Sequence, residues 1–126
     1  MIKIINLKKI NKKDGDLLKY LDKKNKYFKK FGETYFSKIK YKKFKGWFNH
    51  KKNKFFVTVP VGSVEIRFKL KSKIKKLIIN DNSYKLLVIY PGTWYSFYSL
   101  SKNSLIVNTL DNIYEDNEVI KRKSLE

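Results

Sequence analysis

Cysteine, alanine and glutamine are absent from this 126-residue chain, and histidine occurs once, at position 50. Without cysteine the chain can form no disulfide, thiol nucleophile or thiolate metal site. One histidine cannot supply the two or three imidazoles of a typical metal site, so we expect no metal ion. We also expect no cofactor, because the sequence has no glycine-rich phosphate loop, paired metal-ligand motif or Gly-x-Ser-x-Gly elbow.

Long apolar runs are missing as well. No run of about 18 apolar residues is present, so we expect no membrane-spanning helix. Lysines follow the first residues at once and leave no room for an apolar signal-peptide core. The lack of cysteine is compatible with the cytoplasm, where we expect the protein to be. With 126 residues, 42% of them hydrophobic, we expect a single domain over residues 1–126.

Acidic residues are scarce, and the formal net charge is +19. Such a charge suggests a polyanionic partner, either nucleic acid, anionic lipid or a phosphorylated ligand. The basic residues, however, are almost all lysine, with only Arg67 and Arg122 as exceptions, and Asn and Ile are abundant. Nucleic-acid binders more often use arginine for bidentate contacts, whereas this composition is typical of an AT-rich genome. The lysines thus form either a solvated surface or a polyanion site, and we do not expect nucleic acid as the partner.

The hydrophobic pattern predicts about nine short strands with turns every 8 to 12 residues. The clearest is residues 63–70, where Val64, Ile66, Phe68 and Leu70 alternate with polar residues. Residues 84–90 are apolar on both faces, which predicts a strand buried between two layers. The other expected strands are residues 1–10, 17–21, 33–40, 55–61, 74–79, 94–100 and 104–110.

Two connections affect the predicted architecture. Residues 22–31 could form one helix, capped by Asp22 and ended by Gly32, or a basic loop. Residues 55–61 and 63–70, separated by Gly62, predict a hairpin that would present His50 toward a cavity. The predicted fold class is therefore all-β, an antiparallel sandwich, barrel or jelly roll with at most one short helix.

Candidate site residues gather around the aromatic segments. His50 follows Trp47, Phe48 and Asn49, a setting that suits a planar base or sugar, although a lone histidine can also be structural. In the strand 94–100, Tyr95 and Phe97 share one face, which is either plain core or the wall of a pocket. Lys45 and Lys85 could contact a diphosphate, or could only be solvated.

Several segments occur in an order and at spacings typical of one family. They are Gly-Glu-Thr-Tyr-Phe-Ser-Lys-Ile-Lys at 32–40, Lys-Gly-Trp-Phe-Asn-His-Lys at 45–51, Val-Gly at 61–62, Tyr-Lys-Leu-Leu-Val-Ile-Tyr-Pro-Gly-Thr-Trp-Tyr at 84–95, Leu-Ser at 100–101, Tyr114 and Glu118. Over roughly residues 14–122 the chain resembles the small cupins of the dTDP-4-dehydrorhamnose 3,5-epimerase superfamily and the related dTDP-sugar 3,4-ketoisomerases. The resemblance implies a cupin jelly roll, a homodimer that shares strands, and a nucleotide-linked 4-keto-6-deoxy sugar in the barrel.

The same resemblance implies a histidine base that removes a proton beside the C4 ketone, a tyrosine acid, and basic residues on the diphosphate. This chain departs from the pattern at several of these positions. Lys45 stands for an arginine and Phe48 for the base, and His50 matches only a second histidine. Tyr95 stands for the histidine that ends a Pro-Gly-x-x-His segment, and Asn108 for the acid tyrosine.

These departures leave His50 as a relocated base and Tyr35 as an acid. We expect substrate contacts from the following residues: Lys45, Trp47, Phe48, Asn49, Lys85, Tyr95, Asn108 and Tyr114. The sequence therefore predicts a nucleotide-sugar epimerase or isomerase of polysaccharide sugar biosynthesis with altered catalytic residues. The alternatives are a non-catalytic cupin or partner subunit that binds a nucleotide sugar and, on charge alone, a polyanion-binding domain.

Overall fold

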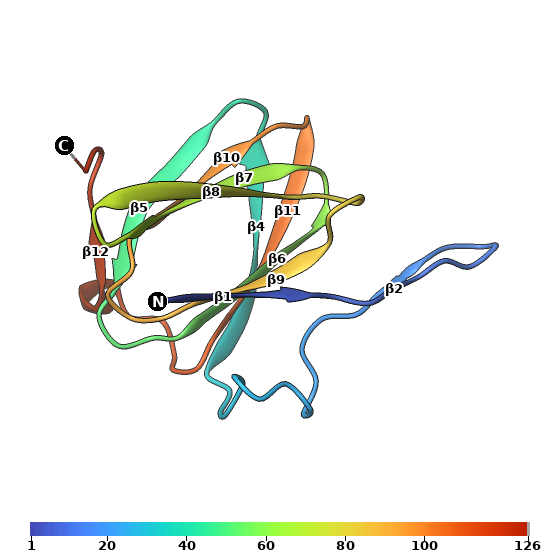
Figure 1. The fold of residues 1–126 in the computed structure, drawn as a ribbon, viewed down its shortest axis with the longest axis horizontal. Coiled ribbons are helices and arrows are strands. Elements are labelled where there is room, and N and C mark those ends of the chain that lie inside the picture. Colours follow the sequence, from blue (N-terminus) through green and yellow to red (C-terminus); the bar gives the residue numbers. More distant parts are fainter. Residues whose placement is uncertain (126) are drawn as a thin grey trace.

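Two five-stranded antiparallel sheets pack face to face in the computed structural model, which describes residues 1–125 (Figure 1). The first sheet has the strand order β1 (Ile2–Asn6), β9 (Lys85–Ile89), β6 (Phe55–Val61), β11 (Asn103–Leu110) and β4 (Glu33–Lys40). The second has the order β12 (Val119–Lys121), β5 (Phe44–His50), β10 (Tyr95–Ser99), β7 (Val64–Leu70) and β8 (Lys73–Ile79). Neighbours in both sheets are largely distant in sequence, as in a jelly roll.

Two small elements complete the described chain. The short strands β2 (Lys9–Ile10) and β3 (Leu17–Leu18) form a hairpin that projects from the body of the molecule (Figure 1). The 3₁₀ helix η1 (Asp116–Glu118) is the one helical turn within residues 1–125. In the same residues no helix is long and apolar enough to cross a membrane. The predicted class, all-β and antiparallel with at most one short helix, is confirmed.

The main core lies between the sheets. The alternation predicted for residues 63–70 places Val64, Ile66 and Phe68 of β7 inside it. Residues of β9 are buried on both faces, as predicted, because Leu87 enters this core while Leu86 and Val88 face outward under a covering loop. Each fully buried aliphatic side chain of this size stabilises the fold by about 1.5–3 kcal/mol.

The predicted alternative of a helix at residues 22–31 is wrong, and the segment is a loop. The Asp22 carboxylate accepts a hydrogen bond from the amide of Lys24 at 2.8 Å, and Asn25 Oδ1 accepts one from the amide of Tyr27 at 2.9 Å. Such side-chain bonds to the local backbone compete with helical ones. The loop instead lays Phe28 edge-on against Phe56 of the first sheet, with ring centroids 5.4 Å apart.

The predicted hairpin of residues 55–61 and 63–70 is also wrong. Strand β6 pairs with β9 and β11, whereas β7 pairs with β8 and β10 in the other sheet. Gly62, with φ of +89°, carries the chain across, and a Cβ at this position would lie 2.4 Å from the carbonyl oxygen of Asn103. The chain does turn at Gly62, but this turn connects the two sheets and does not join two paired strands. His50 lies at the end of β5, outside the predicted hairpin.

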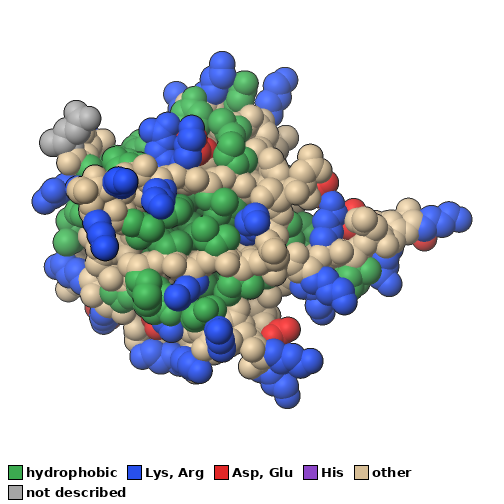
Figure 2. All heavy atoms as spheres, in the orientation of Figure 1, with side chains coloured by type: hydrophobic (Ala, Val, Ile, Leu, Met, Phe, Trp, Pro, Cys, Tyr) green, Lys and Arg blue, Asp and Glu red, His purple; other side chains and the backbone are tan. Residues whose placement is uncertain are grey.

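Basic side chains are spread over the face of the molecule seen in Figure 2, and apolar patches lie between them. On this face the lysines do not gather into one stripe or groove. This distribution fits a solvated basic surface better than a dedicated track for a polyanion.

Candidate functional site

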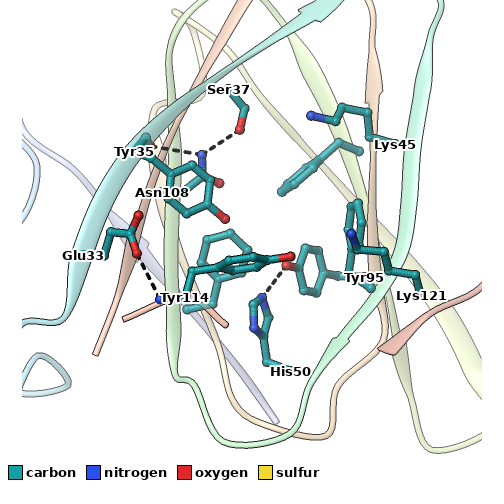
Figure 3. Close-up of a pocket in the computed structure, with 12 residues that line it drawn as sticks. Glu33, Tyr35, Ser37, Lys45, His50, Tyr95, Asn108, Tyr114 and Lys121 are labelled. Atoms are coloured by element: carbon teal, nitrogen blue, oxygen red, sulfur yellow. Dashed lines mark hydrogen bonds between the residues drawn. The ribbon is translucent and has the colours of Figure 1, made fainter. Parts of the chain in front are cut away.

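A cavity of about 390 Å³ lies between β4 of the first sheet and β5, β10 and β12 of the second (Figure 3). Its walls are largely aromatic, with a few polar and charged groups that point inward. The lining residues are Glu33, Tyr35, Ser37, Lys45, Phe48, His50, Phe55, Tyr95, Phe97, Asn108, Tyr114 and Lys121. Within residues 1–125, no group of three or more His, Cys, Asp or Glu side chains is placed to hold a metal ion.

A bulge in β5 decides which of its residues face this cavity. Tyr95 pairs with Phe48 but Ser96 pairs with Gly46, so Trp47 is one residue extra on β5. Gly46 permits the close approach of the strands, because its φ is +143° and a Cβ would lie 2.6 Å from Ser96 Cβ. The bulge shifts by one residue the alternation of inward-facing and outward-facing side chains along β5. As a result both Lys45 and Phe48 line the cavity.

His50 links two other buried side chains at the base of the cavity. Its Nδ1 lies 2.9 Å from Glu118 Oε2, and its Nε2 lies 2.8 Å from the hydroxyl oxygen of Tyr95 (Figure 3 draws the second bond). Only 3% of the His50 surface and 3% of the Glu118 and Tyr95 surfaces are exposed. A buried chain of carboxylate, imidazole and phenol therefore spans three separate segments of the sequence.

The carboxylate of Glu118 is the fixed end of this chain. Its Oε1 also accepts hydrogen bonds from the backbone amides of Asn53 at 2.9 Å and Lys52 at 3.2 Å. Burial acts to raise the pKa of Glu118, but the bonds from His50 and from these amides outweigh it and lower the pKa below its usual value. An ionised Glu118 requires a proton on His50 Nδ1, so Nε2 is the acceptor and the Tyr95 hydroxyl donates to it.

Three phenols surround the same space. Burial raises the pKa of Tyr95 well above 10.0 and raises that of Tyr35 to about 12, and negative charge on neighbouring groups acts in the same direction. Burial likewise raises the pKa of Tyr114. The rings of Tyr35 and Tyr114 meet edge-on with centroids 6.5 Å apart. At neutral pH these groups remain protonated hydrogen-bond donors.

Asn108 of β11 has a fixed orientation. Its Nδ2 donates to Ser37 Oγ at 3.0 Å and to the carbonyl oxygens of Tyr35 and Ile106 at 3.2 and 3.3 Å. Because the amide nitrogen is committed to protein acceptors, the amide oxygen is the atom that Asn108 can offer to a bound donor.

The structure brings most of the sequence-predicted residues together. His50, Tyr35, Lys45, Phe48, Tyr95, Asn108 and Tyr114 all line the cavity. Three others lie outside it. Trp47 is turned away by the bulge and packs on Phe44, Asn49 donates to the carbonyl oxygen of Gly92 at 3.3 Å, and Lys85 donates to Asn6 at 2.9 Å on the first sheet.

Sequence reasoning missed several residues of the site. Glu33 and Ser37 share a strand face with Tyr35, so the period-two pattern could have identified them. Phe97, which the sequence placed on one face with Tyr95 as either core or pocket wall, lines the cavity. Glu118 belongs to the segments that carry the family resemblance but was given no role in the site, and Lys121 carried no signal in the sequence. They lie in the polar C-terminal segment, which reaches the cavity only because β12 pairs with β5.

This fold and cavity define a small cupin with the architecture of dTDP-sugar isomerases and epimerases. The dTDP sugar isomerase from Desulfovibrio desulfuricans G20 is 25% identical, with a TM-score of 0.89 over 96% of this chain and 83% of that one. The sugar 3,4-ketoisomerase QdtA from Thermoanaerobacterium thermosaccharolyticum is 23% identical, with a TM-score of 0.83 over 97% and 88%. The 3,5-epimerase RmlC from Legionella pneumophila is 19% identical, with a TM-score of 0.84 over 98% and 73%.

Residues 1–124 match the family described as FdtA: WxcM-like, C-terminal, and the chain belongs to this family. A comparison with curated protein sequences found no match. The resemblance seen in the sequence is thus confirmed at the level of family and fold.

The lowered pKa of Glu118 predicts a pH-dependent contribution to stability. A carboxylate whose folded pKa lies below its unfolded value, about 4.3, stabilises the fold above that value and loses this effect as the pH falls through the folded pKa. We expect Glu118→Gln to lower the free energy of unfolding by about 1–3 kcal/mol at pH 7, because it weakens charge-assisted hydrogen bonds. The difference from wild type should shrink below about pH 4. Urea unfolding at several pH values measures it.

The matched control is Glu115→Gln, since Glu115 is an exposed carboxylate 3.9 Å from Lys52. It should change stability by less than about 0.5 kcal/mol. Equal effects of the two substitutions would contradict a special role for Glu118.

Proposed function

We propose that this protein catalyses proton transfer beside the ketone of a nucleotide-linked 4-keto-6-deoxyhexose, as an isomerase or epimerase of cytoplasmic polysaccharide sugar synthesis. The proposal rests on the buried hydrogen-bonded chain of Glu118, His50 and Tyr95 beside the cavity. Figure 3 shows Tyr35 on the wall of the cavity opposite Tyr95. Removing a proton beside a ketone requires a base, and returning it requires an acid, each worth about 10²–10⁴ in rate.

In this proposal His50 supplies the basic centre. A proton that reaches Nε2 makes an imidazolium, and the Glu118 carboxylate at 2.9 Å from Nδ1 stabilises that charge. Tyr35 enters from β4, across the cavity from Tyr95 on β10. With its pKa raised to about 12 by burial, Tyr35 is a neutral phenol that donates to the developing enolate or returns the proton.

The nucleotide would be held at the other side of the cavity. Lys45 of β5 and Lys121 of β12 bring two ammonium groups to its lining, and neither has an acidic partner among the described ion pairs. Ammonium groups are suitable partners for a diphosphate. The rings of Phe48 and Tyr114 offer apolar faces to a sugar or base, and the Asn108 amide oxygen can accept a hydrogen bond from a sugar hydroxyl.

Proteins of the same fold support this substrate class. QdtA is described in complex with TDP, and RmlC in complex with dTDP-4-keto-L-rhamnose. A cavity of about 390 Å³ suits a ligand of this size that lies partly outside it.

Phe48 favours a second candidate function, binding of the nucleotide sugar without chemistry. It lines the cavity at the position where the family resemblance places a histidine base. Phenylalanine cannot accept a proton at any pH. In this reading the protein is a sugar-nucleotide binder or the partner subunit of an active enzyme.

Proton exchange distinguishes the two functions. With dTDP-4-keto-6-deoxyglucose in D₂O, we expect the purified protein to replace the C3 or C5 proton by deuterium faster than buffer alone, as followed by proton NMR. His50→Asn should lower this rate at least 100-fold, whereas the neighbouring exposed Lys51→Asn should not change it. Binding without exchange would instead indicate the second function, and Phe48→His should then introduce exchange.

Removal of the two ammonium groups tests the nucleotide position. We expect Lys45→Met and Lys121→Met each to weaken TDP binding by about three- to tenfold in calorimetry, since a partly exposed charged contact is worth about 1 kcal/mol. Lys85→Met is the matched control, because Lys85 lies outside the cavity, and it should leave the affinity unchanged. A larger loss of TDP affinity in Lys85→Met than in Lys45→Met would contradict the placement of the diphosphate beside Lys45 and Lys121.

We also propose that residues 1–126 form a single cupin domain that assembles as a homodimer. Strand β4 is an edge of the first sheet, and its Phe36 is 67% exposed, so the strand offers both free backbone groups and an apolar side chain to a second copy. Light scattering should give twice the chain mass of 15.1 kDa. Phe36→Lys should shift the mass toward one chain while Ile74→Lys, at an exposed site on β8, should not. A monomeric wild type would refute the dimer.

A further inference from the structure

Both ring nitrogens of His50 are already occupied in the folded protein. Nδ1 is held by Glu118 at 2.9 Å and Nε2 by the Tyr95 hydroxyl at 2.8 Å. A base must bring a free lone pair within hydrogen-bond distance of the proton that it removes. His50 therefore has no atom that can meet a substrate carbon directly unless the phenol moves away.

Packing against neighbouring aromatic rings holds the Tyr95 side chain in place. Its ring contacts those of Phe48, Phe55 and Phe97 with centroids 5.6, 5.1 and 5.5 Å apart. It also lies parallel to the His50 ring, at 5.8 Å and an interplanar angle of 8°. Swinging this side chain out would empty a close-packed space and leave Nε2 without a partner, and both changes are unfavourable.

The Tyr95 hydroxyl donates its proton to His50 Nε2, so the lone pairs of the Tyr95 oxygen are not used in that hydrogen bond. Because the Tyr95 proton points to Nε2, its oxygen lone pairs point elsewhere, and Tyr95 is part of the cavity wall. Tyr35 is not equivalent, since no base among the described residues is hydrogen-bonded to its hydroxyl. Tyr95 is thus a phenol of the cavity whose own proton is held by an imidazole, so it can give up that proton to His50 as it accepts another from the cavity.

We propose that Tyr95 is the catalytic residue that exchanges a proton with the substrate, and that His50 acts through it as a positioning and proton-storing residue. This inference rests on the proposed function. In the forward step the Tyr95 oxygen forms a new O–H bond to the proton beside the ketone as its original proton passes to His50 Nε2. The electron pair of the broken C–H bond forms the enolate double bond, and the ketone oxygen takes the negative charge.

The reverse step restores all groups. When Tyr95 gives a proton back to the same carbon, His50 returns its proton to Tyr95 and the enolate becomes the ketone again. When the proton goes instead to the former carbonyl carbon, the proton of the neighbouring hydroxyl also passes to the enolate oxygen, and the ketone forms at the neighbouring carbon. No oxidant or reductant is needed. The histidine thus alternates between neutral ring and imidazolium beside Glu118, out of contact with the substrate.

The test uses Tyr95→Phe in the full-length protein, with dTDP-4-keto-6-deoxyglucose in D₂O. We expect the exchange rate to fall at least 100-fold while the affinity for TDP stays within about threefold. Tyr98→Phe is the matched control, because Tyr98 lies on the same strand but faces away from the cavity, and it should exchange at the wild-type rate. Exchange by Tyr95→Phe at or above the wild-type rate would overturn the proposal, since His50 would then act directly.

A second measurement does not depend on activity. The chain has one histidine, so the ring nitrogen signals in a ¹⁵N NMR spectrum belong to His50 alone. We expect the tautomer with the proton on Nδ1, and a shift of the Nε2 signal in Tyr95→Phe. A proton on Nε2 in the wild type would overturn the relay even if the variant fails to fold. If the wild type shows no exchange, the proposed catalytic function is refuted. If the wild type exchanges and Tyr95→Phe exchanges equally fast, only the role of Tyr95 is refuted.

Discussion

The buried carboxylate of Glu118 is the constraint on which the site depends. It accepts hydrogen bonds from His50 Nδ1 and from the amides of Asn53 and Lys52, and its own carbonyl oxygen accepts the amide of Lys51 at 2.8 Å. A buried charge without such partners would cost several kcal/mol, so the burial of Glu118 depends on these bonds. In forming them, the C-terminal segment is tied to the end of β5. The same connection sets the tautomer of His50 and brings β12 alongside β5.

The second constraint is aromatic packing around the polar chain. Phe48, Phe55 and Phe97 contact the Tyr95 ring, and the rings of Tyr35 on β4 and of Tyr114, in the segment between β11 and η1, meet edge-on at the cavity. Apolar rings exclude water from the imidazole and phenol, which keeps the phenols neutral and strengthens the hydrogen bonds between them. The same packing that would favour proton transfer through Tyr95 would also suit a site that only binds a sugar. The two proposed functions therefore differ in chemistry and not in shape.

Local patterns account for most of the fold. The alternation in residues 63–70 and the apolar run in residues 84–90 each predict a strand from residues that are adjacent in the sequence. The structure has a strand in both places, β7 and β9. The helix at residues 22–31 and the hairpin around Gly62 fail for a different reason. Whether Phe28 packs along a helix or onto Phe56, and whether β7 pairs with β6 or with β10, depends on segments far away in sequence. No local pattern reports on those partners.

The sequence by itself determined most of the strands and the family, and it made His50, Tyr35 and Tyr95 candidate residues, because strand periodicity and motif spacing are properties of neighbouring residues. It did not predict β5 or β12. Only the tertiary structure decided how these residues act on one another. The bulge at Trp47 shifts the alternation of β5 and thereby selects which residues enter the cavity. The approach of Glu118 across 68 positions of sequence fixes the proton on His50 and turns a lone histidine into the centre of a hydrogen-bonded chain.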